Sequence, residues 1–255
     1  MHARFHAPAA ERTGDVVELP HDEAQHLVRV LRLKVGAAVR IFNGRGAEFD
    51  GVVAKASKDG ARVRVEQSRA AVPEARVAVT LAQAVLKGDK MDDIVRDAVM
   101  MGVAAIQPLV TARTEIALAA LGRGHRRERW QRIAVSSSKQ CGRAVVPAVL
   151  EPRTFTDASE ALWDQAREAT SGSALPGLLC VEPTASADVI SMGDLESAPP
   201  LASTIIVGPE GGWTAAEITA GSSACRLVTL GPRTLRADAM AIIALTALLT
   251  RWREL

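Results

Sequence analysis

Two Gly-Pro corners near the end of the chain limit its possible folds more than any other feature. Residues 205–217 have the sequence IIVGPEGGWTAAE, and residues 226–238 have the sequence RLVTLGPRTLRAD. Each begins with a short apolar run, which is typical of a strand buried on both faces of a parallel sheet. The loops that follow such strands meet at one edge of the sheet, where α/β proteins bind ligands. The two corners predict an α/β domain with a ligand pocket.

The first corner has the residues needed for a tight turn into a helix. Gly208, Gly211 and Gly212 can adopt backbone angles that are closed to other residues. Thr214 and Glu217 have the spacing of a capping box, which predicts a helix directly after the corner. One corner of this kind is also compatible with a plain β-to-α turn without a ligand. Two such corners favour a pocket.

The second corner carries charge. Arg233 and Arg236 lie in the predicted loop, and Asp238 precedes an apolar helix predicted over 239–252. A helix that is apolar nearly all round is buried, either in the core or against another subunit. The alternative interpretation is that the arginines are solvated and that Asp238 only caps the helix.

Residues 16–70 have the alternation and the turn signals of a β domain. The predicted elements are a helix over 22–32, strands over 39–42, 47–55 and 61–66, and an Asn-Gly turn after residue 42. On that helix His26, Arg29 and Arg32 share one face, because they are three residues apart. The segment predicts a small barrel-like domain of the size of RNA-binding modules.

After a linker near residue 73 the pattern changes to apolar strands that alternate with helices. The predicted elements are strands over 77–82, 103–109, 177–182, 204–207 and 227–230, and a helix over 92–101. This alternation predicts βαβ units in a parallel sheet. We therefore predict two domains, residues 1–72 and residues 73–255.

The charge is uneven along the chain. Residues 1–150 hold 24 Lys and Arg against 16 Asp and Glu, and residues 151–255 hold 7 against 13, so the two parts carry +8 and −6. An excess of positive charge is typical of a surface that binds a polyanion, although it also serves solubility. Arginines crowd around Trp130, and Ser and basic residues follow at 136–143; this composition suits phosphate contacts or a solvated helix face.

Several classes of protein are excluded by what the sequence lacks. The three cysteines are widely spaced and have no metal-ligand spacing, so they predict reduced thiols in a cytoplasmic protein. No phosphate-binding loop motif occurs, and the longest apolar run, residues 239–249, is too short to span a bilayer. We expect no metal site, no signal peptide and no membrane association.

Six segments together resemble the RsmE family of small-subunit ribosomal RNA uridine N3-methyltransferases. They are HLVRVLR (26–32), KGDKM (87–91), RW (129–130), QCGR (140–143), VGPEGG (207–212) and LGPRTLR (230–236). They occur in the order of the family and cover most of the chain. Two segments depart from the family pattern: Ala237-Asp238-Ala239 replaces the usual Thr-Glu-Thr, and Met100-Met101-Gly102-Val103 replaces Glu-Leu-Gly-Val.

The resemblance implies a fold and a reaction. The C-terminal domain would be a SPOUT-type α/β domain, a parallel sheet with a C-terminal trefoil knot, and the N-terminal domain a PUA-like β-barrel. The enzyme would be a homodimer that uses S-adenosylmethionine to methylate uridine N3 in 16S ribosomal RNA (the uridine-1498 type), as naked RNA or in the small ribosomal subunit. Another SPOUT methyltransferase that acts on ribose 2′-O, and a non-catalytic ribosome- or RNA-binding protein, are the alternatives.

The resemblance also implies roles for individual residues. Those expected to bind the cofactor are Leu179, Val181, Glu182, Val207, Gly208, Pro209, Gly211, Gly212, Leu230, Gly231, Thr234 and Leu235. Those expected to bind RNA are His26, Arg29, Arg32, Lys87 and Arg143. Those expected to be catalytic are Arg233, Arg236 and Glu210.

The chemistry of uridine explains the choice of catalytic residues. Loss of the N3 proton puts negative charge on the ring oxygens, which Arg233 or Arg236 would stabilise. Glu210 and Asp238 are the nearest carboxylates to receive the proton, and water is the alternative base.

Overall fold

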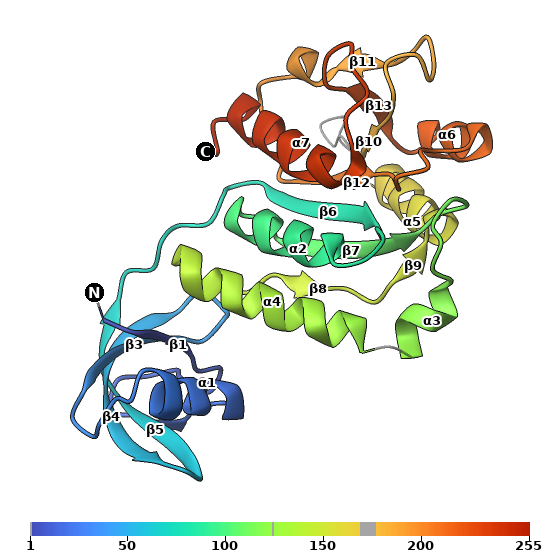
Figure 1. Cartoon of the computed structure of the whole chain (residues 1–255). Coiled ribbons are helices and arrows are strands. Elements are labelled where there is room, and N and C mark those ends of the chain that lie inside the picture. Colours follow the sequence, from blue (N-terminus) through green and yellow to red (C-terminus); the bar gives the residue numbers. More distant parts are fainter. Residues whose placement is uncertain (1, 124, 169–176) are drawn as a thin grey trace. The chain divides into compact units, whose positions relative to one another are not determined.

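The structure is a computed structural model that describes residues 2–123, 125–168 and 177–255 (Figure 1), and the chain divides into two compact units. Unit 1 consists of the residues up to Glu74 together with Val135–Val146. Unit 2 consists of Ala75–Ala134 and Pro147–Leu255.

Unit 1 is built on a five-stranded sheet with the order β1-β3-β4-β5-β2. Its strands are β1 (Arg4–His6), β2 (Val16–Glu18), β3 (Ala38–Phe42), β4 (Glu48–Ser57) and β5 (Gly60–Arg69). β1 pairs with β3 in parallel and the other pairs are antiparallel. The predicted hairpin is confirmed, because β3 and β4 pair across the turn that begins at Asn43. The Asn43 side chain stabilises this turn by accepting hydrogen bonds from the N–H groups of Arg45 and Ala47.

The sheet of unit 1 bends over its own core. The register of β4 against β5 shifts between Asp50 and Gly51 and again between Val53 and Lys55, and such bulges bend a strand. A Cβ atom on Gly51 would lie 2.8 Å from the carbonyl oxygen of Arg64, so only glycine fits there. The enclosed core includes Phe5, Leu27, Ile41, Val53 and Val63.

The predicted helix over 22–32 is wrong in its second half. A short α-helix, α1 (His21–Gln25), continues into a π-helical turn, η1 (His26–Val30). The Leu31 N–H bonds to the His26 carbonyl five residues earlier, and Arg32 then takes a φ of 52°, which ends the helix. The residues His26, Arg29 and Arg32 therefore do not share one face of a continuous helix.

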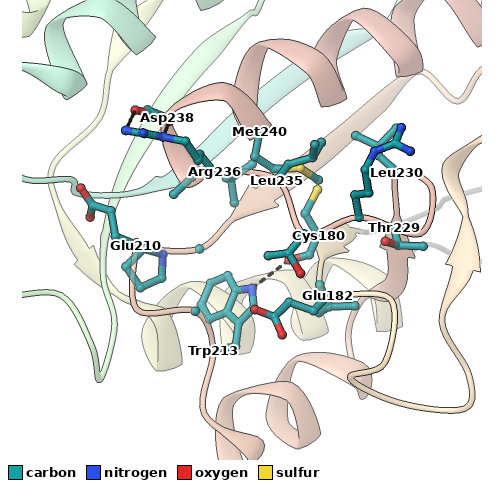
Figure 2. Close-up of a pocket in the computed structure, with 18 of the residues that line it drawn as sticks. Cys180, Glu182, Glu210, Trp213, Thr229, Leu230, Leu235, Arg236, Asp238 and Met240 are labelled. Atoms are coloured by element: carbon teal, nitrogen blue, oxygen red, sulfur yellow. Dashed lines mark hydrogen bonds and ion pairs between the residues drawn. The ribbon is translucent and has the colours of Figure 1, made fainter.

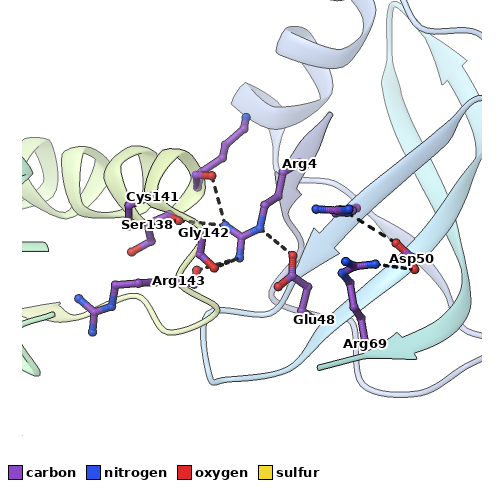
Figure 3. A network of polar contacts seen from close by, with 10 residues as sticks. Arg4, Glu48, Asp50, Arg69, Ser138, Cys141, Gly142 and Arg143 are labelled. Atoms are coloured by element: carbon purple, nitrogen blue, oxygen red, sulfur yellow. Dashed lines mark hydrogen bonds and ion pairs between the residues drawn. The ribbon is translucent and has the colours of Figure 1, made fainter. Parts of the chain in front are cut away.

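Arg4 of β1 holds the end of helix α4 (Arg126–Cys141) within unit 1 (Figure 3). Its side chain is only 10% exposed and lies 3.9 Å from the centre of the Phe42 ring. The acceptors of Arg4 are Glu48 Oε1 at 2.9 Å and the carbonyl oxygens of Ser138, Lys139, Gly142 and Arg143 at 2.8 to 3.3 Å. The last carbonyl groups of a helix lack partners within it, so this guanidinium both caps and neutralises the negative end of the helix.

Unit 2 is built on a parallel sheet, as predicted. Its order is β11-β13-β10-β12-β6-β7-β8, with β9 also beside β7, and every recorded pair is parallel. The strands are β6 (Ala78–Ala84), β7 (Ala105–Val110), β8 (Ala148–Val149), β9 (Arg153–Thr154), β10 (Gly177–Cys180), β11 (Ile190–Ser191), β12 (Ala202–Val207) and β13 (Arg226–Thr229). The helices are α2 (Lys90–Met100), α3 (Leu118–Arg123), α5 (Phe155–Glu168), α6 (Ala215–Ser222), α7 (Ala237–Arg251) and the 3-10 turn η2 (Met192–Asp194).

Helix α7 begins two residues before its predicted start. Arg236 is the capping residue, but its side chain makes no capping hydrogen bond, and Asp238 lies in the first turn. The prediction that Asp238 precedes the helix is therefore wrong, because the helix already includes Ala237, a strong helix former. α7 lies beside α2 (Figure 1). No helix in the described part of the chain is long and apolar enough to cross a membrane.

Candidate active site

The carboxyl ends of three neighbouring strands of unit 2, β13, β10 and β12, surround a cavity of about 430 Å³ (Figure 2). The lining residues fall within three segments that begin at the last residue of each strand: 180–183 from β10, 207–213 from β12 and 229–238 from β13. Lys90 from α2 and Met240 from α7 complete the lining. Both Gly-Pro corners thus contribute to one pocket, as the sequence predicts.

The first corner is organised by a tryptophan. The Trp213 indole N–H donates to the Cys180 carbonyl at 2.8 Å, and its ring packs against Phe155. A Cβ atom on Gly208 would lie 2.9 Å from that indole ring, so the glycine makes room for it. The Trp213 ring is therefore held in place and connects the end of β10 to the loop after β12.

The predicted capping box at the start of α6 is confirmed. The Thr214 side chain accepts from the Glu217 N–H at 3.2 Å, and Glu217 Oε2 accepts from the Thr214 N–H at 2.9 Å. Glu217 Oε1 also accepts from the N–H of Ala112 at 2.8 Å. This one carboxylate therefore fixes both the helix start and the loop after β7.

Four charged side chains form a cluster at one end of the cavity. Lys90 Nζ lies 2.9 Å from Glu210 and 4.0 Å from Asp238, and Arg236 donates two hydrogen bonds to Asp238 at 3.0 and 3.2 Å. Figure 2 shows Glu210, Arg236 and Asp238 together at this end, away from Glu182 and Thr229. The cluster carries no net charge, because two cations face two carboxylates.

The cluster keeps both carboxyl groups ionised. Partial burial alone would raise the pKa of Glu210, but hydrogen bonds from Lys90 and from backbone N–H groups outweigh it and the pKa lies below its usual value. The hydrogen bonds from Arg236 lower the pKa of Asp238. Both residues are therefore carboxylates at neutral pH.

The structure brings together most of the residues predicted at the cofactor site. The predicted residues that line the cavity are Val181, Glu182, Val207, Gly208, Pro209, Gly212, Leu230, Thr234 and Leu235, with Arg233, Arg236 and Glu210. Three others do not line it. Leu179 is fully buried behind the strand, Gly211 is next to Arg113, and Gly231 turns the second corner with a φ of 73°.

Four of the five residues predicted to bind RNA belong to unit 1, and the fifth belongs to unit 2. Arg29 and Arg32 are exposed in unit 1. His26 is half-buried there, with its Nδ1 atom 3.0 Å from Lys139 Nζ. Arg143 is buried in unit 1 and pairs with Glu74.

Lys87 is the one predicted RNA-binding residue that lies in unit 2. Its side chain is exposed and pairs with Glu115, and its N–H donates to Glu210 at 3.3 Å. Lys87 is thus placed beside the charged end of the cavity.

Sequence reasoning did not assign roles to Lys90, Arg113 or Trp213, which all contact the first corner. Lys90 belongs to the KGDKM segment and Trp213 follows the Gly-Gly pair, so both were near recognised motifs. Arg113 lies 98 residues from Gly211, whose carbonyl oxygen accepts its hydrogen bond at 2.7 Å. No local pattern signals such a contact.

Two of the three thiols are buried. Burial raises the pKa of Cys180 and of Cys225 to about 12, and all three cysteines are free. No group of metal-ligating side chains occurs within the described ranges of the chain.

Comparisons with known proteins agree with this geometry. The model of an RNA methyltransferase domain matches residues 73–249, and that of an RNA methyltransferase PUA domain matches residues 19–66. The ribosomal RNA small subunit methyltransferase E of Synechocystis is 31% identical over 90% of this chain and 71% of the relative. The protein of the same name from Bacillus subtilis is 29% identical over 95% of this chain and 90% of the relative.

Two solved structures have closely similar folds. One is a putative methyltransferase from Legionella pneumophila in complex with the cofactor SAM, with a TM-score of 0.84, 29% identity and coverage of 98% of each chain. The other is a ribosomal RNA small subunit methyltransferase E from Neisseria gonorrhoeae bound to S-adenosyl methionine, with a TM-score of 0.84, 29% identity and coverage of 99% of this chain and 98% of that one.

Proposed function

This chain belongs to the RNA methyltransferase family, and from this premise we propose that it methylates N3 of a uridine in 16S ribosomal RNA with S-adenosylmethionine as the methyl donor. The observation that carries the proposal is the cavity at the ends of β10, β12 and β13, in a chain that matches the family over both of its domains. The proposed position is the uridine-1498 type.

The residues of the cavity fit this cofactor. A volume of about 430 Å³ lies within the usual range of roughly 300–1,000 Å³ for small-molecule sites. Apolar side chains such as Leu230, Leu235 and Met240 suit an adenine ring, and Glu182 offers acceptors for ribose hydroxyl groups. Gly208 and Gly212 leave the backbone open to a close approach. These segments would hold the cofactor.

The chemistry divides between the cofactor and the chain. When bound, S-adenosylmethionine supplies a methyl group whose bonding pair returns to sulfur. The chain must align the base and remove the N3 proton, so that the nitrogen lone pair can form the new bond. Glu210 and Asp238 are the carboxylates placed to accept that proton, and Arg236 or Arg233 stabilises the charge that develops on the ring oxygens.

Lys90 offsets the negative charge of the two carboxylates. It lies between Glu210 and Asp238, so its charge keeps both carboxylates from repelling an anionic base. Arg236 is 78% exposed and has Asp238 as its partner, so its guanidinium can turn toward a substrate without first leaving a buried site.

The remaining assignments are proposals supported by family membership. Residues 1–72 would form a PUA-like barrel that binds RNA through His26, Arg29 and Arg32, with Lys87 contributing from 73–255. Arg143, which is buried and paired with Glu74, would support the barrel and not contact the RNA itself. The C-terminal domain would contain a trefoil knot and would form a homodimer, and the enzyme would act in the cytoplasm. Ile243 on α7 is 40% exposed and supplies an apolar surface for such a dimer.

A direct assay tests the reaction. The purified protein is incubated with S-adenosylmethionine and small ribosomal subunits that lack N3-methyluridine, and the RNA is mapped by mass spectrometry. We expect N3-methyluridine at a single position. A ribose 2′-O-methyl product would support the other SPOUT activity, and tight RNA binding without any product would support a non-catalytic role.

Two substitutions test the roles of the arginines. If Arg236→Ala and Arg233→Ala both keep full turnover, the electrostatic role assigned to this loop is wrong. We expect Arg236→Ala to lower kcat by roughly 10²-fold or more, as loss of one such donor does elsewhere, while cofactor binding changes little.

A further inference from the structure

A second cavity adjoins the first. Its volume is about 290 Å³, and its lining is Val85, Lys87, Arg113, Glu115, Glu210 and Gly211. Residues 85–87 follow β6 and residues 113–115 follow β7, so the cavity lies along the same sheet edge as the first. Glu210 lines both cavities, so it joins them.

Arg113 is fixed at the boundary between the second cavity and the glycine corner. Its Nη1 atom donates to the Gly211 carbonyl at 2.7 Å, and a Cβ atom on Gly211 would lie 3.1 Å from Arg113 Cβ. Glu217 holds the preceding residue, Ala112, by its N–H. The loop is closed further by the Thr111 N–H, which donates to the Thr114 hydroxyl at 3.1 Å. Arg113 is exposed, and this hydrogen bond holds its guanidinium at the corner. Within the described part of the chain the Gly211 carbonyl is its one hydrogen-bond acceptor, so its other N–H donors can bind a ligand.

The charges around this cavity select the kind of ligand. Lys87 and Arg113 supply two positive charges, and Glu115 and Glu210 supply two negative charges. A phosphate group would gain from the cations but would be repelled by the carboxylates. A neutral ring that has both kinds of group matches the site, because its acceptors can bind Lys87 and Arg113 and its donor can bind a carboxylate. The volume lies just below the range of drug-sized sites, about 300–1,000 Å³, which suits one nucleobase.

Uracil has this pattern on a single edge, because two carbonyl oxygens flank the N3–H group. We propose, on the basis of the proposed function, that the second cavity receives the target uracil, with Arg113 and Lys87 donating to its carbonyl oxygens and Glu210 facing N3–H. An enzyme that acts on a base takes it out of the stack into such a pocket. Because Glu210 lines both cavities, N3 would lie where the two cavities meet.

The arrangement also explains selection against cytosine. Cytosine carries an amino group in place of one carbonyl and an unprotonated N3, so a donor would face a donor and Glu210 would face a lone pair. Arg113 is therefore a specificity-determining residue of the site. Leaving such polar groups unmatched rejects the wrong base strongly.

Variants of Arg113 test the proposal. In the assay with small subunits, Arg113→Ala should lower kcat/KM by roughly 10- to 150-fold, the equivalent of one hydrogen bond from a charged group. Arg113→Lys, which keeps the charge but loses the planar fork, should restore only part of it. Binding of S-adenosylmethionine, measured by calorimetry, should stay within twofold. Arg226→Ala is the matched control, because Arg226 is an exposed arginine at the opposite end of β13.

The outcomes separate this proposal from the proposed function. If the wild-type protein forms no N3-methyluridine, the proposed function fails first. If it forms the product and Arg113→Ala keeps kcat/KM within twofold, the uracil site alone is wrong. An RNA with cytidine at the target position gives the second readout. Arg113→Ala should reduce the ratio of kcat/KM for the uridine RNA to kcat/KM for the cytidine RNA. If kcat/KM instead falls equally for both RNAs, and the salt dependence of binding falls by one phosphate contact, the cavity binds a phosphate group and the proposal is wrong.

Discussion

At the scale of single residues, the cavity depends on glycines because a larger side chain would clash with neighbouring atoms. A methyl group at Gly208 would lie 2.9 Å from the Trp213 ring, which the Cys180 carbonyl holds in place. We expect Gly208→Ala to destabilise the protein by about 1–3 kcal/mol, as overpacking does, and to weaken S-adenosylmethionine binding by at least about tenfold. Urea unfolding and calorimetry measure the two effects.

A second glycine is the control for this prediction. Gly122 lies in α3. Among the described residues, no atom outside its chain neighbours and the backbone of its own helix comes within 4 Å of the place that a Cβ atom would take, so Gly122→Ala should be neutral or slightly stabilising. A Gly208→Ala protein that binds the cofactor as tightly as the wild type would show that Trp213 can move aside without consequence.

The same scale shows where sequence reasoning ends. Gly208, Glu210 and Gly212 were identifiable because the corner motif is local. Lys90 and Arg113 were not, because each reaches the corner from another strand or helix, and only the order of the parallel strands brings them there.

At the scale of elements, helix α4 ends on a charged side chain from β1. Arg4 neutralises the last carbonyl groups of α4 and pairs with Glu48, whose side chain is only 7% exposed (Figure 3). Arg4→Met removes the cation and leaves that carboxylate buried without its partner, so we expect a loss of about 3–5 kcal/mol in the free energy of unfolding. Arg64→Met, which breaks an exposed pair with Glu66, should cost no more than about 1 kcal/mol. Similar losses for the two variants would contradict this account.

The elements themselves were largely predictable, and their ends were not. Apolar periodicity identified the βαβ unit and eight strands, which are β3, β4, β5, β6, β7, β10, β12 and β13. It failed at η1, because a π turn shares its residue types with an α-helix, and at α7, because Ala237 extends the helix past the expected cap. Strands of two residues, such as β8 and β11, are too short for a periodic pattern.

At the scale of the whole molecule, segments far apart in sequence complete each unit. Val135–Val146 belongs to unit 1 through contacts such as those of Arg4, 134 residues before Ser138. The sequence does not predict that Val135–Val146 belongs to unit 1, because Arg4 binds backbone carbonyl groups, which every residue has. The arrangement gives unit 1 several polar contacts with little exposure to solvent.

Two histidines of unit 1 have lowered pKa values, which makes the stability of this unit dependent on pH. Burial lowers the pKa of His6 from 6.5, with Arg4 and Arg45 adding to this effect and Asp22 and a backbone hydrogen bond with Asn43 opposing it. Burial and then the charge of Lys139 lower the pKa of His26, and Glu23 opposes them.

A histidine whose pKa is lower in the folded state than in the unfolded state binds its proton more readily when unfolded. The contribution of His6 and His26 is therefore complete above pH 6.5 and is lost as the pH falls through the lowered values. We expect a lower urea midpoint at pH 5.5 than at pH 7.5, with the difference reduced in a His6→Gln, His26→Gln double variant. Hydrogen exchange should show the loss in amides of unit 1, such as those of β3 and β4. Equal loss of protection in the strands of unit 2 would mean that other groups control the transition, because both histidines lie in unit 1.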